Sequence, residues 1–152
     1  MLKLSGFAER DANAFRLLAA FLDILDKKAD KNELLCAAEW FTVRSLALFG
    51  YNPELENCVH CGAKVKADAV FFSFSRGGTA CGDCAARASD ATKVSASAIK
   101  ILRLMAGGQR GGSKIIIKKK SLAEAKKVLD GFIDWRLEYP LKSRAIVSRF
   151  WA

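Results

Sequence analysis

The chain is organised around two cysteine pairs, Cys58-Val59-His60-Cys61 and Cys81-Gly82-Asp83-Cys84, which nineteen residues separate. A tetrahedral Zn²⁺ takes four soft ligands, and each Cys-x2-Cys turn supplies two thiolates. A small residue follows each second cysteine and lets the backbone pass close to a metal. The spacing therefore predicts one zinc ion, held by Cys58, Cys61, Cys81 and Cys84. Because four thiolates leave no coordination position for a substrate, we expect a structural metal.

The residues between the pairs predict a β-hairpin. Val70-Phe71-Phe72-Ser73-Phe74 is rich in aromatic and β-branched residues, as strands are, whereas residues 76–79 contain two adjacent glycines and indicate a turn. Residues 79–81 then form the return strand. The hairpin and the cysteine pairs together predict a small β zinc ribbon over residues 58–89.

Other roles for these cysteines and for the single histidine are weaker. Paired cysteines also occur in redox and disulfide proteins, but no βαβ pattern surrounds these pairs and no secretory signal precedes them. His60 lies between two ligands, where a side chain normally faces solvent, so we do not expect it to bind metal or act as a base. Cys36 lies in an apolar stretch and is interpreted as a small buried hydrophobe.

Periodic apolar segments before the cysteines predict an antiparallel helical hairpin over residues 1–57. In the first segment, about 11–28, apolar residues cover more than half of the helix circumference, so we expect it to be buried on two sides. Asp30 and Glu33 form a capping-box pattern that opens the second helix, which ends by Gly50.

Residues 90–152 are predicted to add helices that pack on the first two. Residues 85–93 are small and polar, which indicates a connector, and Ser95 or Ser97 then caps a short helix. The chain is therefore predicted to be mainly α, a helical domain with an inserted small β zinc ribbon whose metal is held by four cysteines.

A basic segment precedes the last predicted helix. Ser121 and Glu124 form a second capping-box pattern that opens this helix, and Lys118-Lys119-Lys120 stands directly before it. Because positive charge is unfavourable at a helix N-terminus, the lysine run is either a solvated loop or an anion site. Together with Lys114, these lysines are candidate DNA contacts on charge alone.

The net charge of +9 lies mostly in the last third of the chain. Residues 101–152 hold 12 Lys and Arg against 4 Asp and Glu, whereas residues 1–100 hold 13 against 12. Such asymmetry favours a polyanionic partner, nucleic acid before a membrane surface. No apolar run approaches the length of a membrane span, and zinc-binding thiols need a reducing compartment, so we expect a cytoplasmic protein.

Catalytic motifs are weak throughout the sequence. Gly107 and Gly112 have the spacing of a phosphate-binding loop, but Ser113-Lys114 inverts the order that grips phosphate and Mg²⁺, and a helix precedes the loop where a strand should stand. No Ser/His/Asp order, paired-carboxylate setting or metal-activated water is indicated. We therefore expect a protein that is not an enzyme.

Two segments resemble a known family. The first is Phe41-Thr42-Val43-Arg44-Ser45-Leu46-Ala47-Leu48-Phe49-Gly50-Tyr51, followed by Pro53-Glu54-Leu55 and the first cysteine pair. The second is Tyr139-Pro140-Leu141-Lys142-Ser143-Arg144. Both are similar to segments of the RecO recombination mediators, and the resemblance covers about residues 11–150. That family begins with an OB-fold domain of short strands, which nothing here resembles, so we expect the C-terminal part of a longer protein or a truncated homologue.

The resemblance implies a bacterial, nucleoid-associated DNA repair protein that binds single- and double-stranded DNA and anneals complementary strands. It implies that the protein works with RecR to load the RecA recombinase onto DNA coated by single-strand-binding protein. The metal-ligand pattern carries over onto the four cysteines, and Lys142 and Arg144 carry over loosely as DNA contacts. The alternative is a zinc-ribbon adaptor that binds a protein partner and no DNA, with the basic tail as solvated surface.

The resemblance also implies docking of the acidic, Phe-ended tail of single-strand-binding protein. Such a ligand needs an apolar pocket rimmed by cations. The helix that begins after Asp30 offers both, with Arg44 three or four residues from two of the apolar candidates. The candidate partner-binding residues are Trp40, Phe41, Arg44 and Leu48. The competing hypothesis is that the aromatic residues only fill the core.

Overall fold

The computed structural model describes residues 12–27, 30–66, 70–107 and 117–137. The helices are α1 (Ala12–Lys27), α2 (Lys31–Leu48), α3 (Gly82–Ala85), α4 (Ala96–Ala106) and α5 (Lys119–Arg136). The strands are β1 (Val70–Ser73), β2 (Gly78–Ala80) and β3 (Ala91–Val94). They form one antiparallel sheet in the order β2-β1-β3. The predicted class, mainly α with a small inserted β unit, is confirmed.

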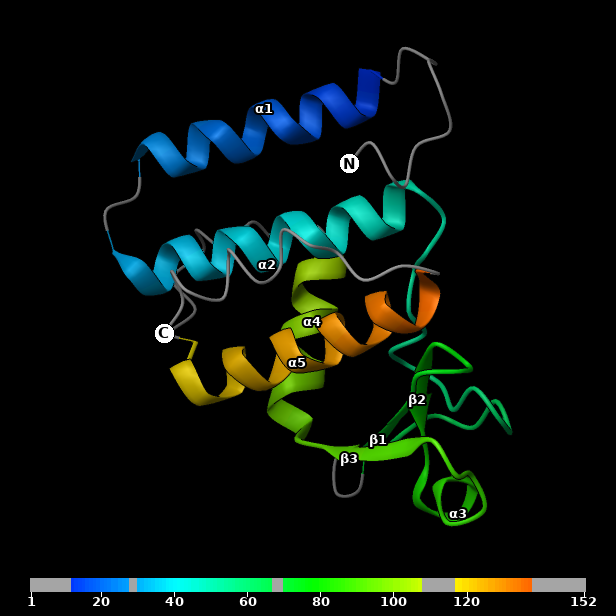
Figure 1. The fold of residues 1–152 in the computed structure, drawn as a ribbon. Helices are drawn as coiled ribbons and strands as arrows, with labels where there is room; N and C mark the ends of the chain where they lie inside the picture. The colour runs from blue at the N-terminus through cyan, green and yellow to red at the C-terminus, as the bar shows by residue number, and fades with distance from the viewer. Residues whose placement is uncertain (1–11, 28–29, 67–69, 108–116, 138–152) are drawn as a thin grey trace.

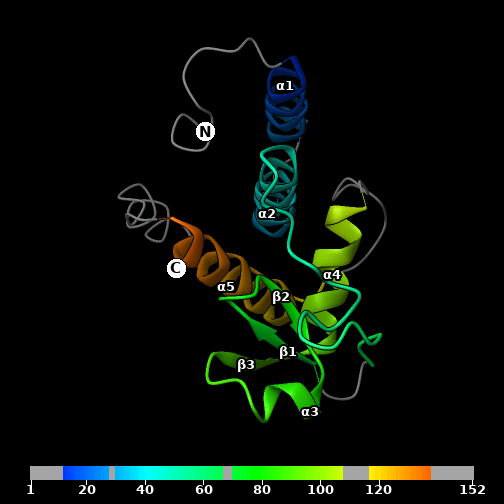
Figure 2. The same ribbon diagram turned by 90° about the vertical axis from the view of Figure 1, so that its right-hand side faces the viewer.

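The elements form two ends joined by a middle layer. Figure 1 shows α1 and α2 stacked at one end and the sheet with α3 at the other, with α4 and α5 between them. Figure 2 shows the same order from the side, where α4 and α5 diverge beneath α2. None of the helices among the described residues is long and apolar enough to cross a bilayer.

The helical hairpin predicted at the start of the chain is present. α1 and α2 run antiparallel (Figure 1), and the Phe21 and Phe41 rings stack between them at 4.5 Å. Asp30 caps α2, because its carboxylate accepts hydrogen bonds from the N–H groups of Asn32 (2.9 Å) and Glu33 (3.1 Å). The predicted start of α1 at Asp11 lies outside the described residues.

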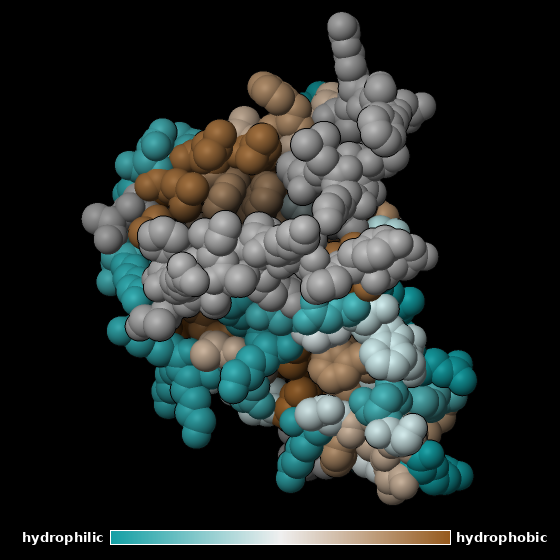
Figure 3. Space-filling model, viewed as in Figure 1, coloured by the Kyte–Doolittle hydropathy of each residue, from teal (hydrophilic) through white to brown (hydrophobic). Residues whose placement is uncertain are grey.

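The prediction that α1 is buried on two sides is wrong for the described residues. No α1 residue is fully buried, and Phe15 and Leu22 are 73% and 51% exposed. Figure 3 shows apolar surface in this region of the molecule. Apolar content alone does not reveal whether a second neighbour is present, and among the described elements α2 is the main partner of α1.

The core lies where α2, α4, α5 and the sheet meet. The Phe72 and Phe132 rings meet edge to face at 6.2 Å and join β1 to α5. Buried Glu39 on α2 lies 3.8 Å from the ammonium group of Lys126 on α5, which also pairs with Asp130 at 2.8 Å. The largest fully buried apolar side chains are Phe72, Phe132, Ile99, Leu102, Leu129 and Val43.

The predicted capping box at the start of the last helix is wrong. α5 begins at Lys119, three residues earlier than a helix capped by Ser121 would, and its N-cap residue Lys118 makes no side-chain capping bond. The Glu124 carboxylate instead accepts hydrogen bonds from the N–H (2.7 Å) and the hydroxyl (2.6 Å) of Ser95, and Ser121 donates to Ser97 at 3.0 Å. Ser121 and Glu124 therefore connect α5 to the start of α4 through hydrogen bonds. Ser95 is the N-cap of α4, as one of the two predicted alternatives requires.

The connector predicted over residues 85–93 is also wrong in its second half. Residues 91–94 form β3, which pairs with β1 from Val70↔Val94 to Ser73↔Ala91. Asp90 holds the junction, since its carboxylate accepts hydrogen bonds from the Ser73 hydroxyl and the Ser75 N–H, both at 2.9 Å. The sequence did not predict β3, because its residues are small or polar and its partner β1 lies about twenty positions earlier.

Candidate metal centre and flanking surfaces

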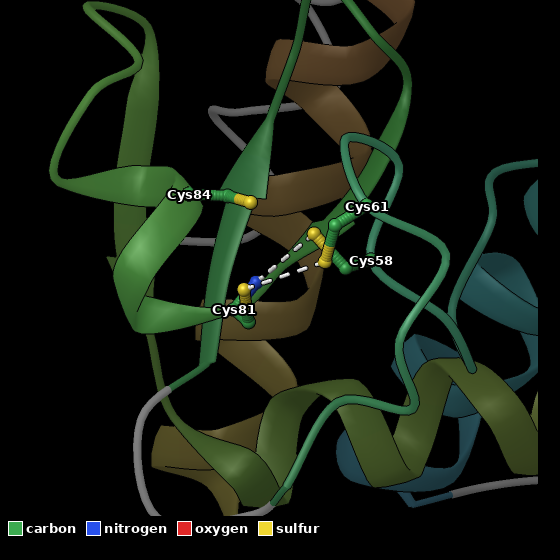
Figure 4. Close-up of side chains that lie close together, drawn as sticks. All are labelled: Cys58, Cys61, Cys81 and Cys84. Atoms are coloured by element: carbon green, nitrogen blue, oxygen red, sulfur yellow. Dashed lines mark hydrogen bonds between the residues drawn. The ribbon is translucent and has the colours of Figure 1, made fainter.

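The four predicted ligands lie together at the end of the sheet (Figure 4). The sulfur atoms of Cys58, Cys61, Cys81 and Cys84 all lie within 4.8 Å of one another. All four are free thiols, and the Cys61 and Cys81 sulfurs are 3.8 Å apart. A tetrahedral site with Zn–S bonds of about 2.3 Å has neighbouring sulfurs about 3.8 Å apart. The cluster therefore has the size of a four-thiolate metal site.

The first pair lies on a tight loop. Gly62 has a φ of +74°, which glycine adopts readily, and its N–H donates to the Cys58 carbonyl at 2.8 Å. The Cys58 N–H donates to the Ala63 carbonyl at 2.8 Å, which closes the loop. The loop brings both sulfurs to the same side, where the Cys58 sulfur also accepts the Cys81 N–H at 3.4 Å. His60 is exposed, as expected for a residue between two ligands.

The second pair lies where β2 passes into α3. Cys81 occupies the N-cap position of α3, and its carbonyl accepts the Ala85 N–H at 2.9 Å. This turn of helix carries Cys84 back toward the first pair, as Figure 4 shows. The two pairs thus approach the cluster from a loop and from a helix start.

A close backbone contact holds the first pair against β2. Thr79 donates its N–H to the Glu54 carbonyl at 2.8 Å and accepts the Val59 N–H at 2.9 Å. A Cβ atom at Gly78 would lie 2.5 Å from the Glu54 carbonyl oxygen and 2.6 Å from Val59 Cγ1. Only glycine permits this approach. The sequence placed Gly78 in a turn, but its role is to let two segments touch.

The thiols influence one another strongly. Burial opposes ionisation of Cys58, but N–H groups of Cys81, Cys61 and His60 outweigh it and lower the Cys58 pKa to about 6. The pKa of Cys84 is raised to about 12, first by its hydrogen bond with Cys81 and then by burial and by the remaining thiols. Four adjacent thiolates need a cation to balance their charge, and soft thiolates suit Zn²⁺ and iron. The residues present therefore fit a metal ion.

Three of the candidate DNA contacts are described. Lys118, Lys119 and Lys120 are exposed at the start of α5. Lys120 lines a groove of about 500 Å³ between α5 and the sheet, together with Lys93 and Lys127. The sequence pattern did not indicate Lys93 and Lys127, because each is an isolated lysine that only the tertiary structure brings near the run. Lys114, Lys142 and Arg144, as well as most of the glycine-rich loop, lie outside the described residues.

The candidate partner-binding residues divide between a groove and the core. Trp40, Arg44 and Leu48 line a groove of about 530 Å³ between α1 and α2. Phe41 does not line it, since its ring stacks on Phe21. One Arg44 guanidinium nitrogen donates to the Ala106 carbonyl at 3.0 Å. Arg16 on α1 also lines the groove. The sequence did not indicate it as a partner-binding residue, because its position there depends on how α1 and α2 pair.

Trp40, which lines this groove, has a buried indole nitrogen without a hydrogen-bond partner among the described residues. Only 4% of the residue is exposed. A buried donor without a partner is costly, so this indole group lowers the stability of the described structure.

Comparison with known proteins gives one consistent result. Residues 2–145 match the family model described as Recombination protein O C terminal. The chain is similar to proteins named DNA repair protein RecO from Pelotomaculum thermopropionicum (32% identical, covering 97% of this chain and 56% of that protein) and Desulforamulus reducens (26%, covering 97% and 58%). It is also similar to the protein of that name from Dehalococcoides mccartyi (35%, covering 62% and 37%). No solved structure matches. The chain spans little more than half the length of the first two relatives.

Proposed function

The chain belongs to the RecO family of DNA repair proteins, and from that membership we propose that it acts as a recombination mediator. In this role it binds single- and double-stranded DNA, promotes annealing, and with RecR assists recombinase loading on DNA coated by single-strand-binding protein. It works in the bacterial cytoplasm at the nucleoid, without catalysing a reaction. The observation that carries the proposal is the family match over residues 2–145.

The charge distribution supports DNA binding by this chain. The last third is strongly basic, and Lys118, Lys119 and Lys120 are exposed at the start of α5. Lysine side chains that neutralise phosphates release counterions, which gives binding without sequence preference. We include Lys114, Lys142 and Arg144 in the proposed contact surface on their charge and their place in the sequence.

The metal in this proposal is one structural Zn²⁺ held by Cys58, Cys61, Cys81 and Cys84. Support comes from the sulfur cluster, whose size fits a tetrahedral four-thiolate site. The loop of the first pair and α3 are short and have little core of their own, so a metal at their junction would supply part of the folding free energy of the ribbon.

The α1–α2 groove is the proposed site for the acidic tail of single-strand-binding protein. Trp40 and Leu48 offer apolar contact to its terminal aromatic ring, and Arg16 and Arg44 supply positive charge for its carboxylates. Phe41 contributes by positioning α1 through its stacked contact with Phe21.

DNA binding is tested by fluorescence anisotropy with labelled single-stranded and duplex oligonucleotides across a range of salt concentrations. We expect the triple variant Lys118→Ala, Lys119→Ala, Lys120→Ala to lose affinity for all sequences and to show a flatter salt dependence. The control is Lys100→Ala, which removes an exposed charge from α4. Unchanged affinity and salt slope in the triple variant would show that the lysine run is only solvated surface.

Tail binding is tested by titrating a labelled acidic peptide that ends in Phe. We expect Arg44→Glu and, separately, Arg16→Glu to weaken binding by about tenfold or more, since each reverses a charge at the groove. Arg16 is exposed, so its variant avoids disturbing the Arg44 contact with α4. Undiminished binding in both variants, with circular dichroism confirming the fold, would remove the groove from the proposal.

The groove also favours a second candidate function. A protein that used it without contacting DNA would be a zinc-ribbon adaptor, with the lysines as solvated surface. The two functions separate in the same pair of assays, because an adaptor would bind the peptide and show no salt-dependent affinity for any oligonucleotide.

A further inference from the structure

The groove between α5 and the sheet has an apolar floor and a rim of lysines. Its volume of about 500 Å³ is in the range of small-ligand sites. Its floor is apolar and is formed by Phe74, directly after β1, Val94 on β3 and Val128 on α5. Figure 3 shows apolar surface reaching the outside between α5 and the strands, with hydrophilic surface around it.

Lysines surround this floor. Lys120 and Lys127 stand two turns apart on α5, about 10 Å along the helix axis, and Lys93 lies across from them on β3. Lys118 and Lys119 extend the same charge to the beginning of α5. Positive groups at this spacing reach different phosphates of one strand.

Among the described residues, Glu124 is the one carboxylate that lines the groove, and its oxygens bond to another helix. Glu124 accepts the N–H and the hydroxyl of Ser95 at 2.7 and 2.6 Å, at the start of α4. Both oxygens therefore interact with a helix N-terminus, where negative charge is favourable. The charge that faces an incoming ligand is that of the lysines.

Resting on the proposed function, we propose that this groove is a binding site for single-stranded DNA, in which an unpaired base lies on the apolar floor and the lysines contact adjacent phosphates. The pairing of an apolar surface that includes an aromatic ring with a cationic border is the chemistry that single-strand binding uses. A duplex keeps its bases paired and stacked, so it can reach only the lysines. The groove thus gives the chain a preference for unpaired bases, which bare charge does not.

The test compares two probes that share phosphates and differ in bases. Anisotropy is measured for the whole chain with labelled oligothymidylate and with an abasic oligonucleotide of the same length. Base stacking predicts that the wild-type chain binds the thymidylate about fivefold or more tightly. Ala123 lines the groove and is exposed, so Ala123→Leu fills the groove while keeping every lysine and a good helix former. We expect it to lose the preference for bases and to keep the affinity for the abasic probe.

Two controls distinguish an effect of the groove from a loss of net positive charge and from a general effect of substituting leucine for alanine. Ala19→Leu makes the same change at an exposed position of α1 and should keep the preference. The double variant Lys93→Ala, Lys127→Ala should weaken both probes and lower the magnitude of the salt slope by about 1.4. A matched variant, Lys64→Ala with Lys100→Ala, removes two exposed charges outside the groove. It should change the affinity for the two probes and the salt slope less than Lys93→Ala, Lys127→Ala does.

The outcomes distinguish the groove from the function on which it rests. If the wild-type chain binds oligonucleotides but shows no preference for bases, or if Ala123→Leu keeps it, the groove is not the site and the proposed DNA binding stands. Equal weakening by both lysine pairs would likewise overturn the groove in favour of diffuse charge. If the wild-type chain binds no oligonucleotide, the groove and DNA binding by this chain both fail.

Discussion

Replacing Gly78 with alanine tests whether the contact between β2 and residues 54–59 holds the two cysteine pairs together. Gly78 does not have a positive φ, so only space opposes the new methyl group. That methyl would stand 2.5 Å from the Glu54 carbonyl oxygen, whereas ordinary contact begins at 3.4 Å. The two segments must separate by about 0.9 Å, the difference between these distances.

The size of the effect follows from that displacement. Overpacking of this kind costs about 1–3 kcal/mol. The bond from the Thr79 N–H to the Glu54 carbonyl, 2.8 Å long, would stretch beyond hydrogen-bonding distance, which puts the cost in the upper half of that range. For a chain of this size, about 2 kcal/mol lowers the midpoint of thermal unfolding by roughly 4–8 °C. We also expect faster loss of bound metal, because the first cysteine pair moves with residues 54–59.

The assay is thermal unfolding followed by circular dichroism, together with the rate of zinc transfer to a chromogenic chelator. Gly82→Ala is the matched control, since it adds the same methyl group beside Cys81 at a site with nothing within 4 Å. Its position in α3 favours alanine over glycine. Equal unfolding midpoints and equal zinc release for the two variants would refute the argument from close contact.

Purified protein should contain about one zinc ion per chain by elemental analysis, and Cys81→Ser should lose it, while Cys36→Ser should keep it. Cys36 is buried, and burial raises its pKa, so equal metal loss in both variants would contradict the ligand assignment. Asp90 makes a pH-dependent contribution: the Ser75 hydroxyl and N–H, with the Ser73 hydroxyl, lower its pKa from 3.8 to about 2. A depressed folded-state pKa stabilises the fold above the unfolded value, so this stability is present above about pH 4 and lost as the pH falls toward 2. Denaturant unfolding of Asp90→Asn should show less pH dependence in that window, and an unchanged profile would rule out this contribution.

Local sequence patterns correctly predicted features that depend on residues close together in the chain, such as the cysteine cluster and the cap of α2. The Cys-x2-Cys spacing identified the four clustered residues, because two turns with two sulfurs each need little further information to converge. Asp30 was recognisable as the cap of α2 because a carboxylate two or three residues before free N–H groups has few other roles. The resemblance of two segments, residues 41–55 and 139–144, together indicated the family.

Errors arose where a local pattern was used for a distant contact. Ser121 and Glu124 have the spacing of a cap, but their partners are Ser97 and Ser95 on another helix. The strand β3 was missed because its residues are unremarkable until β1 lies beside them. Both cases are hydrogen bonds between segments about twenty or more residues apart along the chain, and no local spacing encodes them.

Periodicity and spacing within a few turns of chain were enough to predict the helical class and the cysteine cluster, and the resemblance of two short segments indicated the family. Three other features emerged only from the folded molecule: α1 keeps an exposed apolar face, Gly78 is a point of contact, and Lys93 and Lys127 share a groove with Lys120. The physical reason is that exposure, close approach and shared charge depend on which surfaces meet. That is set by packing the whole core, and no single segment contains the information.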